Sequence, residues 1–225
     1  GTVNNQPLLP FEAAGATVIS KKNLSYANGS LEMAIRDDLV AGLREVEDKG
    51  FIDPQFAASA VRPASVANGV SPISSAGTDA AGVRLDLQAL LQPQETANMN
   101  PDEVVLVMNS RLARALSLMR TEFGAVREFP GMTPRGGELE TYPVIASNNV
   151  PLGQITAIHA PSVGYGDDDG IDIEADPSAA VQMDSAPTQD AATPTGSNLV
   201  SMRQTRSVYM QATHYVGWLK LRPSA

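Results

Sequence analysis

The sequence contains no cysteine. It can therefore form no disulfide, and it offers no thiolate nucleophile and no Cys-based zinc or iron–sulfur site. Histidine is nearly as scarce, with only His159 and His214 in 225 residues. A Ser-His-acid site would have to use one of them. Because no G-x-S-x-G motif occurs and His159 lies in the apolar run AIHA, we expect both histidines to be packed in strands and predict no catalytic residue.

Long apolar runs and clustered basic residues are also missing. No stretch of about 18 apolar residues occurs, so no transmembrane helix is expected, and no secretory signal is visible at the N-terminus. Lys and Arg number 16 against 25 Asp and Glu, which gives a net charge of −9. Sequence-independent nucleic-acid binding needs clustered positive charge, and the basic residues of this chain are scattered. The composition therefore argues against a DNA-binding module or a membrane protein.

No cofactor motif is complete. Gly164-Tyr165-Gly166 does not extend to G-x-G-x-x-G, and no Walker A sequence occurs. The acidic run from Asp167 to Glu174 places Gly at its fourth position, where an EF-hand loop needs Gly at the sixth. We therefore interpret the run as a turn that leads into a strand, with a weak cation site at Asp167–Asp169, at a subunit contact, as the alternative. No cofactor is predicted.

The pattern that is present is a long helix over residues 31–49. Its apolar residues recur at spacings of four and three and so share one face; they are Leu31, Ile35, Leu39, Leu43 and Val46. Gly50 is the expected C-terminal stop. The outer face has mixed charge, and Arg36, Arg44 and Glu47 are candidate subunit-contact residues. The alternative is a helix that only covers a core.

The remaining elements mix helices and strands. Alternation from Val208 onward predicts a long closing strand, and Asn109 or Ser110 is expected to cap a helix that begins at Arg111. Residues 51–82 have loop composition and residues 184–198 have linker composition. Further strands are expected at 13–24, 104–108, 142–147, 155–159, 171–175 and 179–183, and helices at 85–91 and 111–122. The fold class is α+β.

Several segments, in this order, resemble the Hong Kong 97-type major capsid family. The resemblance lies in their order and spacing, since no motif is specific alone. The segments are VISKKNL at 18–24, the helix ending in GFIDPQ at 31–55, PASVANGVSPISSAG at 63–77, VVLVMNSRLARALSLM at 104–119, LETYPVIASNNVP at 139–151, the acidic turn at 166–176 and TRSVYMQATHYVGWLKLRPSA at 205–225.

The resemblance implies two domains. Residues 1–52 and 197–225 would form the peripheral domain, with the spine helix and long strands. Residues 53–196 would form the axial domain, a mixed sheet flanked by helices. Family members normally carry an N-terminal arm and a hairpin, the E-loop, before the first strand; both are expected to be largely absent, so the chain is read as a fragment, a processed product or part of a protease–capsid fusion. Some members cross-link Lys to Asn with a Glu on the last strand, and residues 199–218 contain neither Asn nor Glu.

The implied function is structural. Copies would assemble into pentamers and hexamers of an icosahedral shell around phage double-stranded DNA, with the scaffold, maturation protease and portal of the same phage as further partners. The expected location is the virion capsid, after synthesis in the bacterial cytoplasm. Two alternatives are an encapsulin-like nanocompartment that holds protein cargo, and a hydrolase with a Ser/His/Asp site outside known motifs. The last requires His159 or His214 in an open pocket.

Overall fold

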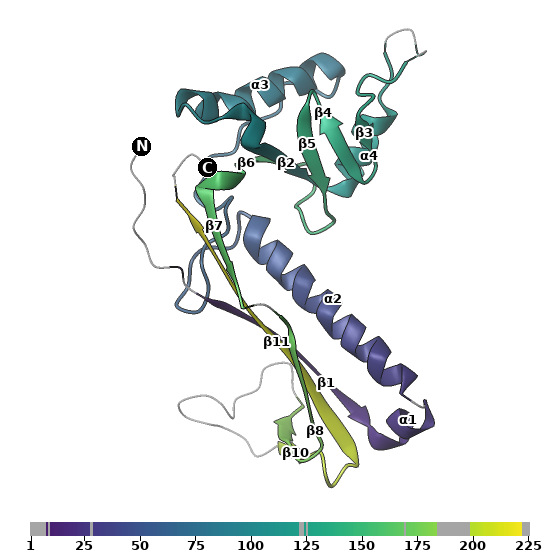
Figure 1. The fold of residues 1–225 in the computed structure, drawn as a ribbon. Helices are drawn as coiled ribbons and strands as arrows, with labels where there is room; N and C mark the ends of the chain where they lie inside the picture. The colour runs from purple at the N-terminus through teal and green to yellow at the C-terminus, as the bar shows by residue number, and fades with distance from the viewer. Residues whose placement is uncertain are drawn as a thin grey trace. The chain divides into compact units, whose positions relative to one another are not determined.

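The computed structural model describes residues 8, 10–27, 29–121, 124, 126–168, 170–183 and 199–221. The chain forms two compact units, each assembled from separate segments (Figure 1). Unit 1 comprises Gly1–Phe11, Glu47–Gly166 and Val216–Ala225, and unit 2 comprises Glu12–Val46 and Asp167–Tyr215. The chain therefore leaves and re-enters each unit, and two long elements contribute residues to both.

Unit 1 contains a five-stranded mixed sheet. Its strand order is β3-β4-β5-β2-β6, with β2 parallel to β5 and antiparallel to β6. The strands are β2 (Val104–Met108), β3 (Met132–Thr133), β4 (Gly136–Leu139), β5 (Tyr142–Ala146) and β6 (Ile155–His159). The sequence of β2, VVLVM, is apolar throughout, as expected for an interior strand covered on both faces. β2 and β6 have the bounds predicted from sequence, and β5 ends one residue early.

Two helices pack against the core of this sheet. Helix α3 (Ala80–Thr96) begins where Asp79 Oδ1 accepts a hydrogen bond from Gly82 N, at 3.0 Å. The helix is longer than the predicted 85–91, because the cap lets it begin earlier and because it continues through Pro93. Helix α4 (Ser110–Leu118) is capped by Asn109, as predicted, but ends before residue 122. The core they share includes Leu87, Leu91, Leu106, Met108, Leu116, Met132 and Leu139.

A second apolar cluster in unit 1 surrounds Trp218. Its buried members are Ile52, Val66, Val150, Ile158, Val216 and Trp218. Residues 53–79 contain no helix and only the isolated bridge between Ser59 and Arg62, which agrees with the predicted loop. Two backbone bonds fold this loop back: Val66 N donates to Phe51 O at 2.8 Å, and Ser65 N donates to Phe56 O at 2.9 Å. Short 3-10 turns η1 (Pro101–Glu103) and η2 (Ala160–Ser162) flank β2 and β6.

A second sheet has four strands. Its strand order is β1-β11-β7, and β8 also pairs with β11. The strands are β1 (Phe11–Ser20), β7 (Val163–Asp167), β8 (Asp172–Asp176) and β11 (Ser207–Lys220); β9 (Ala180–Gln182) and β10 (Leu199–Ser201) form a separate antiparallel pair. The buried and half-buried positions of β11 alternate over its first eight residues, as the sequence predicted. β10 was not predicted, and the expected linker 184–198 lies outside the described residues.

Helix α2 (Ser30–Ile52) is the predicted long helix. Leu43 is buried, and Leu39 and Leu43 lie against Gly15 of β1. Two expectations about it are wrong. Val46 is 49 % exposed, although it follows Leu43 by three residues and was expected on the same buried face. Gly50 does not stop the helix but lies inside it, against the ring of Trp218, where a larger side chain would crowd the indole.

The strand predicted at residues 13–24 also needs correction. It ends at Ser20, whose hydroxyl accepts a hydrogen bond from Asn23 N at 3.3 Å and so caps the short helix α1 (Lys21–Tyr26). The polar capping residue therefore overrides the β-forming run that precedes it. Within the described part of the chain, no helix has the length and apolar character needed to cross a membrane.

Candidate functional site

His159 and Ser162 form a hydrogen-bonded pair at the end of β6. His159 Nδ1 lies 2.7 Å from Ser162 Oγ, and His159 Nε2 lies 3.2 Å from Glu103 Oε2 without a hydrogen bond. This is the Ser, His and acid that a hydrolase would need. However, Ser162 is 1 % exposed and His159 is 3 % exposed. A hydroxyl that no substrate can reach is not a nucleophile, so the contacts hold β6 to η1 and η2 instead.

His214 has a similar structural role in unit 2. It lies on β11 and is 7 % exposed. Its Nε2 lies 2.9 Å from Asp167 Oδ1, at the end of β7. The contact joins two neighbouring strands and leaves the imidazole enclosed. Both histidines are thus packed in strands, as expected from the sequence, and the predicted requirement for a hydrolase, an open pocket beside one of them, is not met.

The acidic run is placed as a turn and a strand. The predicted strand 171–175 is β8, displaced by one residue, and Asp169 lies outside the described residues. Among the residues that the structure describes, no group of three or more His, Asp or Glu side chains is arranged to hold a metal ion. The cation site at Asp167–Asp169 stays a prediction, and no geometry here supports it.

The predicted subunit-contact residues lie along α2 and do not form one cluster. Arg36 Nη2 contacts Glu32 Oε1 at 2.9 Å, one helical turn away, and the Arg36 side chain is 44 % exposed. Arg44 is exposed and Glu47 is half-buried. Such i,i+4 pairs on a helix contribute only about 0.3–0.5 kcal/mol. The assignment of these three residues to subunit contacts therefore stays a prediction.

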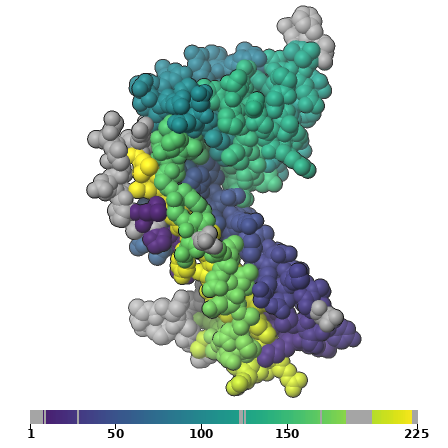
Figure 2. All heavy atoms as spheres, in the orientation of Figure 1, coloured from purple at the N-terminus to yellow at the C-terminus, as the bar shows by residue number. Residues whose placement is uncertain are grey.

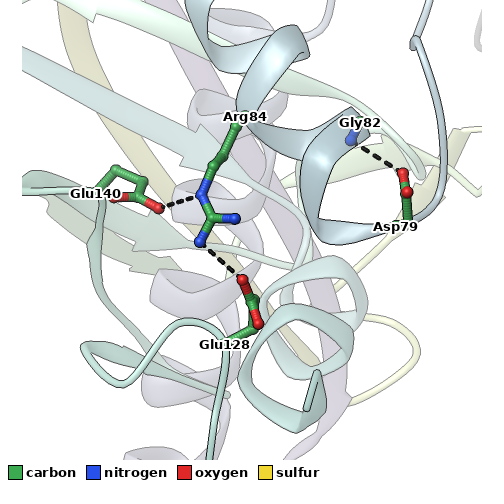
Figure 3. A network of polar contacts seen from close by, with 5 residues as sticks. All are labelled: Asp79, Gly82, Arg84, Glu128 and Glu140. Carbon is green, nitrogen blue, oxygen red and sulfur yellow. Dashed lines mark hydrogen bonds and ion pairs between the residues drawn. The ribbon is translucent and has the colours of Figure 1, made fainter. Parts of the chain in front are cut away.

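A polar network centred on Arg84 was missed by sequence reasoning (Figure 3). Arg84 Nε donates to Glu140 Oε1 at 2.9 Å, and Arg84 Nη2 donates to Glu128 Oε1 at 2.8 Å. The guanidinium also lies over the ring of Phe129, 5.5 Å from its centroid. Hydrogen bonds to Glu140 and then Glu128 raise the pKa of Arg84 above its usual value.

This network fastens three segments of unit 1. Arg84 belongs to α3, Glu128 precedes the buried Phe129, and Glu140 lies in the turn between β4 and β5 with a positive φ of 46°. The partners are far apart in the sequence, so no local pattern could have revealed them. The Arg84 side chain is 47 % exposed, so the pairs stabilise the unit modestly and supply no reactive group.

Large apolar side chains are exposed in both units. Tyr26 is 88 % exposed and Met33 is 68 % exposed in unit 2, while Val61 is 74 % exposed and Leu152 is 66 % exposed in unit 1. Single exposed apolar residues are ordinary on any surface. By themselves they therefore mark no binding site.

A curated protein and several solved structures are similar to this chain. No protein-family model matches the chain. It is 38 % identical over 223 residues to the capsid polyprotein of Pseudomonas phage PAJU2, a match that covers 97 % of the chain and 33 % of the polyprotein. The chain thus spans about a third of the length of this curated relative.

Solved structures share the fold at low sequence identity. A chain from Mycobacterium phage Ogopogo aligns with a TM-score of 0.70 and 12 % identity over 97 % of this chain and 74 % of its own. A chain from Mycobacterium phage Cain aligns with a TM-score of 0.65 and 16 % identity over 95 % and 67 %. The capsid of a native GTA particle aligns with a TM-score of 0.62 and 14 % identity over 97 % and 71 %. The chain therefore has the Hong Kong 97-type fold that these structures share, and over almost its whole length it is similar to about a third of a phage capsid polyprotein.

Proposed function

We propose that this chain forms the wall of a phage head. Copies assemble into pentamers and hexamers, and these capsomers tile an icosahedral shell that encloses double-stranded DNA. The observation that carries the proposal is the relationship to the capsid polyprotein, which extends over 97 % of the chain at 38 % identity. Rings of this kind arise from heterologous contacts, in which one surface of a subunit binds a different surface of the next.

The charge of the chain supports a container. At −9 the subunit as a whole repels a polyanion, and a wall that did not adhere to its contents would let DNA be packed and released. The partners we assign beyond the chain's own copies are the scaffold, maturation protease and portal of the same phage. No membrane and no sequence-specific nucleic-acid contact is assigned. We place synthesis in the bacterial cytoplasm and the final location in the virion.

The domain division is part of the proposal. Residues 1–52 and 197–225 would form the peripheral domain and residues 53–196 the axial domain. The compact units of the structure have other bounds, because α2 and β11 each pass from one unit to the other. What supports the assignment is the discontinuity itself: each unit is built from segments that are distant in the sequence. Limited proteolysis of assembled and unassembled protein would map the domain boundaries.

Expression of the full-length gene product, followed by electron microscopy and sedimentation, tests the proposal. We expect closed shells or capsomers, with nuclease-resistant DNA in particles recovered from phage-producing cells. Shells that contain a protein cargo and no DNA would support a nanocompartment instead. A strictly monomeric product with a hydrolase activity that is lost in His159→Ala would overturn the structural role altogether.

A further inference from the structure

We infer that unit 2 carries two surfaces of opposite charge by which one copy of this chain docks on another. The inference rests on the proposed function, since it names where shell subunits meet. The first surface is the acidic row, formed by Asp172, Glu174 and Asp176 of β8. The second is the basic end, formed by Lys21, Lys22, Arg203 and Arg206.

The acidic row lies on one face of a strand. Alternate residues of a strand point to the same side and are about 7 Å apart, so the three carboxylates form a line. All three residues are exposed. Their cross-strand neighbours on β11 are Thr213, Gln211 and Tyr209, none of which carries positive charge. Tyr209 donates to Gln211 at 3.0 Å and Gln211 donates to Thr213 at 3.2 Å, so these side chains satisfy one another and do not neutralise the row.

The carboxylates of the row have no cationic partner in the described part of the chain. In that part of the chain, their one hydrogen bond runs from Ser178 N to Asp176 Oδ1, at 2.7 Å. Three like charges along one edge repel each other, and Asp and Glu are poor strand formers. Within a single subunit the row therefore lowers stability, and no ion pair among the described residues compensates for the loss. A cationic surface from outside the subunit would supply one.

The basic end brings together most of the positive charge of this unit. Four of the six Lys and Arg side chains of unit 2 belong to it, although the unit is acidic. The backbone bond from Lys21 N to Arg206 O, at 2.8 Å, joins the start of α1 to the turn before β11. In Figure 2 the purple N-terminal segment and the yellow C-terminal segment meet at the bottom of the view, where these elements lie. All four side chains are exposed, and none has an ion pair with a described residue.

The two surfaces are close in number of charges and opposite in sign, which favours a second copy of the chain as the partner. Charge complementarity of this kind steers encounter and fixes the register of docking more than it adds affinity. Among the described residues no ion pair joins the two surfaces within one copy, although Arg206 is only three residues from Tyr209, the cross-strand partner of Asp176. A neighbour can satisfy both, and repetition of the contact links many copies.

A simpler explanation is that the acids only protect an edge strand from unwanted pairing. Charged side chains on an edge do discourage aggregation, and Lys serves this purpose at least as well as Asp or Glu. The two explanations therefore differ in whether the sign of the charge on β8 matters. Edge protection survives a change from acid to Lys, whereas docking on the basic end does not.

Charge reversal in the full-length capsid protein tests the inference. One variant is Asp172→Lys/Glu174→Lys, which leaves Asp176 and its bond to Ser178 intact. A second is Lys22→Glu/Arg203→Glu, and a third combines all four changes. The matched control is Asp37→Lys/Asp38→Lys, which makes the same charge change at exposed positions of α2 in the same unit. Shell yield is measured by sedimentation and electron microscopy at several salt concentrations, and folding is checked by thermal unfolding.

We expect each reversal to lower the yield of shells about tenfold or more at low salt, as the loss of several close charge pairs implies. The combined variant restores most of the yield, and the control stays near wild type. If wild-type protein forms shells and both reversals assemble normally, the inference is wrong while the proposed function stands. If wild-type protein forms no shell or capsomer, both fall.

Duplex DNA is the other partner that a basic surface could take. Fluorescence anisotropy with a short labelled duplex separates the two. Weaker DNA binding in Lys22→Glu/Arg203→Glu, together with normal shell yield and no effect of the combined variant, would overturn docking between copies. Equal, weak DNA binding by wild type and both reversals, together with the loss and rescue of assembly, would support it.

Discussion

Trp218 donates the hydrogen of its indole nitrogen to the carbonyl oxygen of Ala64, at 2.8 Å. The bond joins β11 to the loop at residues 53–79, across most of the sequence. The ring is 2 % exposed and is met edge-on by Phe11 and Phe51, with centroids 5.8 Å and 5.6 Å away. In a chain with 5 % aromatic residues, these contacts concentrate much of the aromatic packing at one point of unit 1.

Removal of this indole should be costly. We expect Trp218→Ala to lower the free energy of unfolding by about 3–5 kcal/mol, because it leaves a cavity and an unpaired carbonyl. Trp218→Phe should lose less, since it keeps part of the packing. Chemical denaturation followed by far-UV circular dichroism measures both. Tyr26→Ala, at a side chain that is 88 % exposed, is the matched control and should change stability by less than about 0.5 kcal/mol.

Two glycines should respond to alanine in opposite directions. Gly42 lies inside α2, and a Cβ there would meet nothing within 4 Å. Gly42→Ala should stabilise the unassembled chain by about 0.5–1 kcal/mol through helix propensity. Gly136 has φ +109°, and a Cβ there would collide with the carbonyl oxygen of Val144 in the neighbouring strand. Gly136→Ala should destabilise unit 1 strongly. Equal effects of the two changes on the unfolding midpoint would contradict the backbone geometry.

Asn109 should matter more than an ordinary helix cap. Its Oδ1 accepts from Arg111 N at 3.0 Å, and its Nδ2 donates to Val150 O at 2.6 Å, with the side chain buried. Asn109→Ser can cap α4 but cannot reach Val150, whereas Asn109→Ala loses both bonds. We expect the free energy of unfolding to fall from wild type to Asn109→Ser and again to Asn109→Ala, with about 2–3 kcal/mol between wild type and Asn109→Ala.

The comparison for this prediction is Asn100→Ala at the exposed cap of η1, where Asn100 Oδ1 accepts from Asp102 N at 3.4 Å. The loss there should stay below about 1 kcal/mol. If Asn109→Ser were as stable as wild type, the bond to Val150 would contribute nothing.

Lys220 should make stability depend on alkaline pH. Partial burial lowers the pKa of Lys220, whose Nζ donates to Asn68 O at 3.0 Å. The unfolded chain therefore binds this proton more tightly than the folded chain, so folding stability rises as pH approaches the ordinary Lys pKa from below. As pH rises towards about 10.5, wild type should gain stability relative to Lys220→Met. Denaturant unfolding at several pH values measures the difference; a constant difference would show that the pKa of Lys220 is not lowered.

The elements that sequence predicted well are those whose signal is local. The apolar run VVLVM, the AIHA strand and the alternation after Val208 needed no distant partner to be recognised, because side-chain period follows directly from backbone geometry. Asn109 was recognisable for the same reason, since capping involves only the next few residues. Short elements were harder: β10 has three residues and no pattern of its own.

Two of the errors concern where an element ends. Gly50 was expected to stop the helix, but α2 continues to Ile52 and Gly50 packs beside the ring of Trp218. Ser20 ends a strand that its neighbours would have extended, because its hydroxyl caps α1. Average propensity is a weak preference of less than about 1 kcal/mol per residue, so capping and packing can override it.

The sequence by itself determined the absence of thiol chemistry, the acidic charge, the α+β class and the order of segments that resembles a capsid fold. Those properties depend on composition and on side-chain periods of two or 3.6 residues, and both can be found in the sequence alone. Only the tertiary structure decided that Ser162 is buried beside His159, that Arg84 joins Glu128 to Glu140, and that Lys21 lies beside Arg206 while β8 presents a row of exposed carboxylates. These relationships link residues through space, and folding brings them together by burying apolar surface elsewhere in the chain, so no local pattern records them.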